Sequence, residues 1–195
     1  VRKYCVKPKF ESFQRSMLEA TKISKKIYSK DGKRVGYFHL WSGTHDEFKE
    51  TLASVAREFE TKVDAMILDI RDGFGGASGD YLDPFLKTPL VFTKKLILLI
   101  NEGSRSGKEY LAHLLKTNKR ATLVGTKTAG YFLGGRLFSI VPNKFDLFLA
   151  ILDGAPFRVE LEGVGVSPDI EVQAPLEHSL GADPQLDRAI LEALN

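Results

Sequence analysis

The sequence predicts an α/β protein with a mostly parallel sheet. Apolar runs of strand length occur at 65–70, 95–101 and 122–125, and they are continuous rather than alternating, as in strands buried on both faces. Segments around 81–86 and 104–116 lie between these runs and are expected to be helical, the second after an initial turn. Because parallel strands need crossover connections, this order indicates right-handed strand–helix–strand units.

The first third of the chain adds two strands and two helices to this pattern. We expect a short strand at 1–9, a helix over 10–28 and a further strand at 35–41, with Asp31-Gly32 as a turn signal.

The clearest helix runs from Thr44 to Phe59. Thr44 and Glu47 have the spacing of a capping box, so Thr44 is expected at the N-cap. The apolar side chains of one helical face are Phe48, Leu52, Val55, Ala56 and Phe59.

The signals change after residue 134. Residues 134–172 have the short strands and turns of an appended β portion, with Asp153-Gly154 as the expected hairpin turn. The chain closes with a helix in which Asp183 is the predicted N-cap and Pro184 the first residue. Leu186, Ile190 and Leu191 form its apolar face.

Composition limits the class of protein. With 195 residues, 43% of them hydrophobic, the chain can form one sizeable core. The net charge of +3 is small and does not favour nucleic acid or an anionic membrane as a partner. A single cysteine, Cys5, excludes an intrachain disulfide and a thiolate metal cluster. No apolar run reaches the roughly 18 residues of a membrane span.

Two strand ends carry residues that could perform chemistry, because sites in open α/β sheets form beyond the carboxyl ends of the strands. The first end is 69–76 and the second is 101–107. A dinucleotide fingerprint fails because Ser78 stands where the third glycine belongs. A P-loop fails because Gly103 and Gly107 enclose three residues instead of four.

The glycines fit an anion hole better. Glycine allows a sharp turn that exposes backbone N–H groups, and such donors stabilise an oxyanion. Ser106 follows a buried strand and precedes a helix, which is where a nucleophile can be exposed at a strand-to-helix turn. The alternative is that Ser104 or Ser106 only caps that helix.

Six segments, in order from residue 33 on, carry a family pattern. They are Gly36–Leu40, Leu68–Arg71 with Gly75-Gly76, Asn101–Glu109, Val124–Gly130, Glu162–Ile170, and Asp183–Leu186 with Ala189. Each motif is unspecific alone. In this order and spacing they resemble the tail-specific (carboxyl-terminal processing) protease family, peptidase family S41, and are closer to its tricorn-like branch.

The resemblance implies a role for each matching residue. Ser106 falls at the position of the nucleophile, and Ser104 falls at an earlier, non-nucleophilic serine. The backbone N–H groups of Gly107 and of Gly75 or Gly76 would form the oxyanion hole.

The family divides by its general base. The processing branch uses a lysine just after the segment that ends at Gly130, but Tyr131 occupies that position here. The tricorn-like branch uses a carboxylate, which matches Glu162, and a histidine from a segment before the core. This chain begins at Val1 without a signal-peptide pattern, so we expect it to be part of a longer protein that supplies the histidine.

Other candidates for the base lie within the chain. They are His39 in the opening strand, His45 in the first turn of a helix, His113 on the helix after Ser106, and His178 in a late loop. Lys108 and Lys127 are close to the site in sequence, although lysines at such positions are usually solvated charges.

The implied fold is a crotonase/ClpP-like α/β core. Residues 1–32 would be the exit from an upstream segment, such as a PDZ-like domain, with a leading helix, and residues 33–195 the tail-specific protease core. The implied function is a serine endopeptidase that acts on unfolded or extended peptides through an acyl-enzyme, with no metal or organic cofactor. The chain alone is expected to be nearly inactive, its oligomeric state is open, and a periplasmic or other extracytoplasmic location is slightly favoured.

Two further functions stay open. Tyr131 and the absent histidine would suit a non-catalytic peptide-binding or scaffold relative of the same family. The related crotonase-type fold uses paired N–H groups on acyl-CoA thioesters, so binding of a CoA ester would favour that class.

Overall fold

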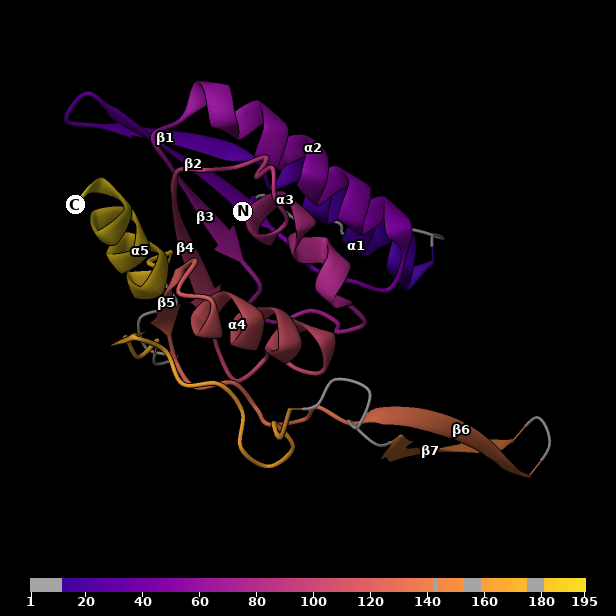
Figure 1. Cartoon of the computed structure of the whole chain (residues 1–195). Helices are drawn as coiled ribbons and strands as arrows, with labels where there is room; N and C mark the ends of the chain where they lie inside the picture. The colour runs from indigo at the N-terminus through magenta and orange to yellow at the C-terminus, as the bar shows by residue number, and fades with distance from the viewer. Residues whose placement is uncertain (1–11, 142–143, 153–158, 175–180) are drawn as a thin grey trace, which may run out of the picture.

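The computed structural model describes residues 12–141, 144–152, 159–174 and 181–195, so the strand expected at 1–9 lies outside it. At its centre is a six-stranded sheet in the order β1-β2-β3-β4-β5-β8 (Figure 1). Only the pair β1–β2 is antiparallel in this sheet, so the predicted mostly parallel α/β architecture is confirmed. Its strands are β1 Lys26–Lys30, β2 Lys33–His39, β3 Ala65–Asp69, β4 Lys95–Ile100, β5 Thr122–Gly125 and β8 Ile170–Glu171.

Helices cover both faces of this sheet (Figure 1). Met66 and Leu68 of β3 pack in one core with α1 to α4, whereas Ala65 and Ile67 pack in a second core with α5. Strands buried on both faces need apolar residues at every position, which explains the continuous runs in the sequence. The helical elements are α1 Phe13–Ile23, α2 Asp46–Lys62, the 3₁₀ turn η1 Gly79–Leu82, α3 Asp83–Leu86, α4 Gly107–Thr117 and α5 Pro184–Leu194.

The start of the described chain differs from the prediction. The helix expected over 10–28 ends at Ile23, and β1 begins at Lys26 because these residues form a hydrogen-bonded ladder with β2. The turn expected at Asp31-Gly32 is present. Its two residues have φ of 51° and 76°, and a two-residue hairpin loop of type I′ requires a positive φ at both positions. Pairing with β2 therefore overrides the local helical pattern at 26–28.

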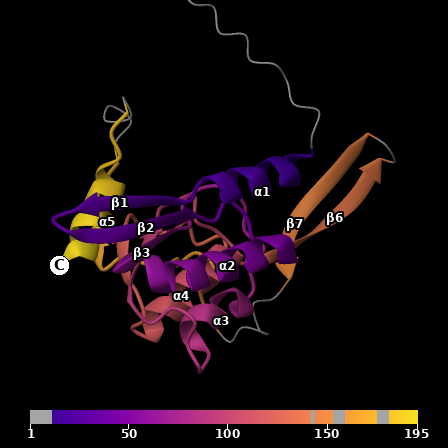
Figure 2. The ribbon, with the colours of Figure 1, turned by 90° about the horizontal axis from the view of Figure 1, so that it is seen from above.

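The predicted capping box of α2 is wrong. The helix begins at Asp46, its N-cap is His45, and the Thr44 hydroxyl lies 3.1 Å from that of Ser42. The preceding residue, Gly43, donates its N–H to the Gly75 carbonyl oxygen (2.9 Å), which holds this segment against the neighbouring loop. The apolar face is confirmed, since all five predicted residues are buried. Figure 2 shows α1 and α2 side by side above the sheet.

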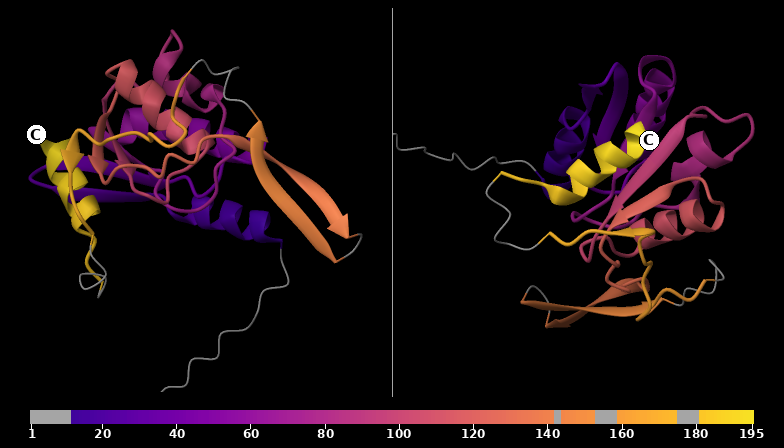
Figure 3. Two further views of the ribbon diagram at one scale, coloured as in Figure 1. Left: turned by 90° about the horizontal axis from the view of Figure 1, so that it is seen from below. Right: turned by 90° about the vertical axis from the view of Figure 1, so that its left-hand side faces the viewer.

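An antiparallel hairpin projects from the core as a separate sheet, which confirms the appended β portion (Figures 1 and 3). Its strands are β6 Gly134–Val141 and β7 Phe145–Leu152, so the turn predicted at 153–154 lies outside the described residues. The register places five apolar side chains on one face, with exposed fractions of 37% to 67%. They are Phe138, Val141, Phe145, Leu147 and Leu149.

The closing helix α5 begins as predicted. The Asp183 side chain accepts the N–H of Leu186, and Pro184 is the first residue. Its buried residues are Gln185, Ala189 and Ala193, whereas Leu191 is 48% exposed and does not belong to the buried face. Within the described part of the chain, no helix has the length and apolarity that crossing a membrane requires.

Candidate active site

The candidate site lies where β3, β4 and β5 end. The three strands run parallel, so the segments that follow them, 70–77, 101–106 and 126–133, leave the same edge of the sheet. This edge contains both strand ends that the sequence singled out.

Ser106 sits at a strained turn directly before α4. Its φ of 56° and ψ of −128° lie in a region that residues with a side chain rarely adopt, at a cost on the order of 1–3 kcal/mol. The turn is held because the Ser106 N–H donates to the Tyr131 carbonyl oxygen (2.8 Å) and to the Glu109 carboxylate (3.2 Å). Strain of this kind is typical of a serine raised between a strand and a helix.

The glycine loop passes directly against Ser106. A Cβ atom added to Gly75 would lie 2.7 Å from the Ser106 Cβ and 3.2 Å from its hydroxyl oxygen. A Cβ added to Gly107 would lie 2.1 Å from the Ala77 carbonyl oxygen. Glycine is therefore required at both positions by the close approach of the two segments.

Among the residues that the structure describes, three glycine N–H groups of the glycine loop and the start of α4 are without a protein acceptor. Gly107 is the first residue of α4, where an N–H has no intrahelical partner. Across the described residues, the N–H groups of Gly75, Gly76 and Gly107 donate to no protein acceptor.

Ser104 is buried and structurally engaged. Its hydroxyl donates to the Ile70 carbonyl oxygen (3.0 Å) and accepts the Asn101 N–H (3.2 Å), which ties the end of β4 to the end of β3. Of the two serines that could cap the helix, Ser106 occupies the N-cap.

Glu162 lies in the loop opposite Tyr131. It is exposed, and one carboxylate oxygen accepts the N–H groups of Phe132 (2.7 Å) and Leu133 (2.8 Å). This fixes the backbone just after Tyr131, whose carbonyl oxygen holds Ser106. The contacts recorded for the Glu162 carboxylate in the described chain are these two amides, and no histidine is among them.

Glu109 was missed as a site residue by the sequence analysis. It is fully buried and accepts from the Thr128 hydroxyl (2.6 Å), the Gly130 N–H (2.7 Å) and the Ser106 N–H. It therefore joins α4 to the segment after β5. Its position three residues after Ser106, the spacing of a capping box, was the signal in the sequence.

Lys108 corrects an expectation. It is fully buried instead of solvated, and its ammonium donates to the carbonyl oxygens of Asp72 (2.7 Å) and Trp41 (3.2 Å). Burial lowers the pKa of Lys108 to about 7, against the opposing attraction of Asp69 and Asp72. Lys127 is exposed, as expected.

The histidines that were candidates for the base lie in different environments. His39 is buried, stacks on Trp41 with ring centroids 3.9 Å apart, and donates from Nε2 to the Arg71 carbonyl oxygen (2.9 Å). Burial lowers its pKa, although Asp69 opposes this.

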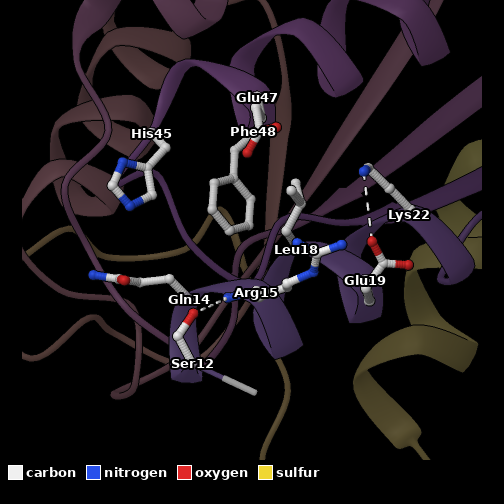
Figure 4. A pocket seen from close by; sticks show the side chains of 9 residues that line it. All are labelled: Ser12, Gln14, Arg15, Leu18, Glu19, Lys22, His45, Glu47 and Phe48. Carbon is white, nitrogen blue, oxygen red and sulfur yellow. Dashed lines mark hydrogen bonds and ion pairs between the residues drawn. The ribbon is translucent and has the colours of Figure 1, made fainter.

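His45 lines a pocket of about 300 Å³ between α1 and the start of α2. Figure 4 shows its ring near Gln14 and Phe48. His113 is partly exposed on the second turn of α4, and His178 lies outside the described residues. In the described part of the chain, no set of three or more His, Cys, Asp or Glu side chains could hold a metal ion.

An ionic cluster fixes the root of the glycine loop. Arg71 donates to Asp69 at the end of β3 (2.7 Å) and to Asp183, the N-cap of α5 (2.7 Å). Asp69 is fully buried, and it also accepts from the Tyr37 hydroxyl (2.8 Å). Burial opposes the charge of Asp69, but His39 and Arg71 outweigh burial and lower its pKa.

These features define a class: an α/β protein with its candidate site beyond the carboxyl edge of a mostly parallel sheet. The sequence model described as Peptidase family S41 matches residues 80–172, which include Ser106 and Glu162. The chain is 29% identical over 189 residues to a carboxyl-terminal-processing protease of Synechocystis sp., covering 83% of this chain and 44% of the relative. It is 26% identical to tricorn protease homolog 1 of Streptomyces coelicolor, covering 86% of this chain and 17% of the relative.

A solved structure supports the same fold. The crystal structure of the tricorn protease matches with a TM-score of 0.63 and 22% identity over 93% of this chain and 19% of that chain. The chain is thus similar to peptidase family S41 over 80–172, which is just under half of its length. It spans less than half the length of the curated relatives described above.

Proposed function

We propose that the protein containing this chain is a serine endopeptidase in which Ser106 is the nucleophile. The observation that carries the proposal is the strained turn that brings the Ser106 hydroxyl against Gly75, at a position matched by the S41 family model. The cost of this backbone conformation is accounted for if the hydroxyl must face a substrate.

The reaction would proceed through an acyl-enzyme. The Ser106 oxygen attacks the peptide carbonyl carbon while a base takes the hydroxyl proton. The negative charge that develops on the carbonyl oxygen is stabilised by the N–H groups of Gly107 and of Gly75 or Gly76. The base then protonates the leaving amine, and water hydrolyses the ester.

The base would come from outside this chain. Tyr131 stands at the position of the family lysine and is 68% exposed, and Lys108 is held by two carbonyl oxygens. As the resemblance to the tricorn-like branch implies, the base would be a histidine from an upstream segment. Glu162 would support that base through the Tyr131–Leu133 backbone that it fixes.

The substrate would be an unfolded or extended peptide. A peptide added as a strand to a sheet edge satisfies its backbone hydrogen bonds without needing a particular sequence. Proteases usually bind an extended peptide substrate in this way.

The test is the Ser106→Ala substitution in the full-length protein. Hydrolysis of an unfolded protein such as casein should fall by several orders of magnitude, because the other groups of a catalytic set act only through the nucleophile. A fluorophosphonate probe should add covalently to the wild type and not to the variant, as read by intact mass. The control is Ser54→Ala, on the exposed face of α2, which should retain both activity and labelling.

The second candidate is a non-catalytic peptide-binding relative. Tyr131 at the lysine position and the use of Glu162 on backbone amides favour it. It predicts peptide binding by the full-length protein without turnover or probe labelling. An upstream segment resembling Asp-x-His-Thr would favour the enzyme instead.

A further inference from the structure

Lys108 is a charged side chain with no exposed surface, two residues after the proposed nucleophile. Burying an ammonium is costly unless it is paired and hydrogen-bonded. Its ammonium donates to two backbone carbonyl oxygens, so its cost is offset by contacts with the main chain.

The two acceptors belong to different segments. Trp41 follows β2, and Asp72 follows β3 at the root of the glycine loop. These segments also pair directly, because the Phe74 N–H donates to the Trp41 carbonyl oxygen (2.8 Å) and the Gly43 N–H donates to that of Gly75 (2.9 Å). Lys108 adds the third segment, α4, to the same junction.

The backbone of residues 72 and 73, next to the Lys108 ammonium, has an unusual conformation and is closely packed. Asp72 has a φ of 51°, which is strained for a residue with a side chain, and Asn101 holds it through its side-chain amide (3.0 Å). Gly73 passes so close that an added Cβ would lie 2.1 Å from the Trp41 carbonyl oxygen and 3.2 Å from Nζ of Lys108. A neutral amine would still have two N–H donors for the two acceptors.

We propose that Lys108 is a positioning residue of the site, which ties the nucleophile helix to the glycine loop and so sets the separation between Ser106 and the N–H groups of Gly75 and Gly76. The expected effect of Lys108 on catalysis rests on the proposed function, in which Ser106 is the nucleophile. Lys108 does not act as the base, since its contacts are the two carbonyl oxygens and the Ser106 hydroxyl is not among them.

The test is Lys108→Met in the full-length protein, because methionine keeps most of the stem and removes the donors. We expect kcat on an unfolded substrate to fall about 100-fold, the effect of a misplacement of about 1 Å, with KM little changed. The urea midpoint should stay equal or rise, because replacing a buried charge by an apolar side chain is often neutral or stabilising. A purely structural role would instead lower kcat and the urea midpoint together, which would overturn the proposal.

The matched control is Lys116→Met. Lys116 is on the same helix and also donates from Nζ to a carbonyl oxygen, that of Ser167 (2.7 Å), but at the other end of α4. It should leave kcat unchanged.

A second measurement does not depend on activity. Hydrogen exchange of peptides covering 70–78 should quicken about ten-fold or more in Lys108→Met and not in Lys116→Met, because the loop loses an anchor. Unchanged exchange in Lys108→Met overturns the proposal even if kcat falls. If the wild type shows no Ser106-dependent hydrolysis, the proposed function fails, and exchange alone decides whether Lys108 anchors the loop.

Discussion

The carboxyl edge of the central sheet and the β6–β7 hairpin are built in opposite ways. At the sheet edge, the charged side chains of Asp69, Lys108 and Glu109 are fully buried, and each has several partners. In the hairpin, apolar side chains are exposed on the outside, and no described residue of β6 or β7 is buried. An isolated two-stranded hairpin is marginally stable, whereas buried polar networks hold a fixed geometry.

This difference shows which part of the fold has a fixed geometry. The edge positions backbone N–H groups and the Ser106 hydroxyl through buried charges that tolerate little movement. Among the described residues, the main contacts of β6 and β7 are with each other, so removal of a single side chain there should change little. Three experiments test this contrast.

The largest effect is expected from Arg71→Leu. The substitution leaves Asp69 without its cation, and breaking a buried pair costs about 3–5 kcal/mol of the free energy of unfolding. Urea unfolding measures the loss. The control Lys25→Met breaks the surface pair with Glu58 and should cost less than about 1 kcal/mol. Equal losses in the two variants would show that the edge cluster is no more constrained than the surface.

The next effect concerns pH. The pKa of Lys108 is about 7 in the folded protein against 10.5 for an ordinary lysine, so between these values the unfolded chain binds the additional proton. The free energy of unfolding should therefore rise with pH in this range, by up to about 1.4 kcal/mol per pH unit.

The measurement is urea unfolding of the wild type and Lys108→Met at several values between pH 7 and 10. The variant lacks the group, so the difference between the two proteins should change with pH. A constant difference would mean that Lys108 keeps an ordinary pKa in the folded protein.

The smallest effect is expected in the hairpin. Leu147→Ser removes an apolar side chain that is 42% exposed, so the free energy of unfolding of the core should change by less than about 0.5 kcal/mol. Leu98→Ala in β4, which is fully buried, should cost about 2–5 kcal/mol in the same urea assay. A loss of several kcal/mol at Leu147 would remove the contrast between the two regions.

The central fold was readable from the sequence because its physical signals are local. Continuous apolar runs predicted β3, β4 and β5, and the face of Phe48 to Phe59 predicted α2. The helix signal at 26–28 failed because β1 forms through pairing with β2, which no short window contains. The cap at Thr44 failed for a similar reason, since Gly43 is held by Gly75.

The candidate site was readable only in part. The glycines and Ser106 stand out by their spacing and by family resemblance, and their roles stay predictions. The inward direction of Lys108 could not be read from the sequence, because a lysine near a helix start is usually solvated. Its acceptors are backbone atoms of residues 36 and 67 positions away. The contacts of Glu109 with Thr128 and Gly130 likewise depend on how β5 lies beside β4.

The link between Arg71 and Asp183 joins residues 112 positions apart in the chain. A ribosome adds residues in order, at about 5–20 per second, so Arg71 is synthesised many seconds before its second carboxylate exists. During that interval the glycine loop lacks the support of α5. In a peptidase, this order of synthesis would keep the active site incomplete while the nascent chain is still extended and susceptible to cleavage.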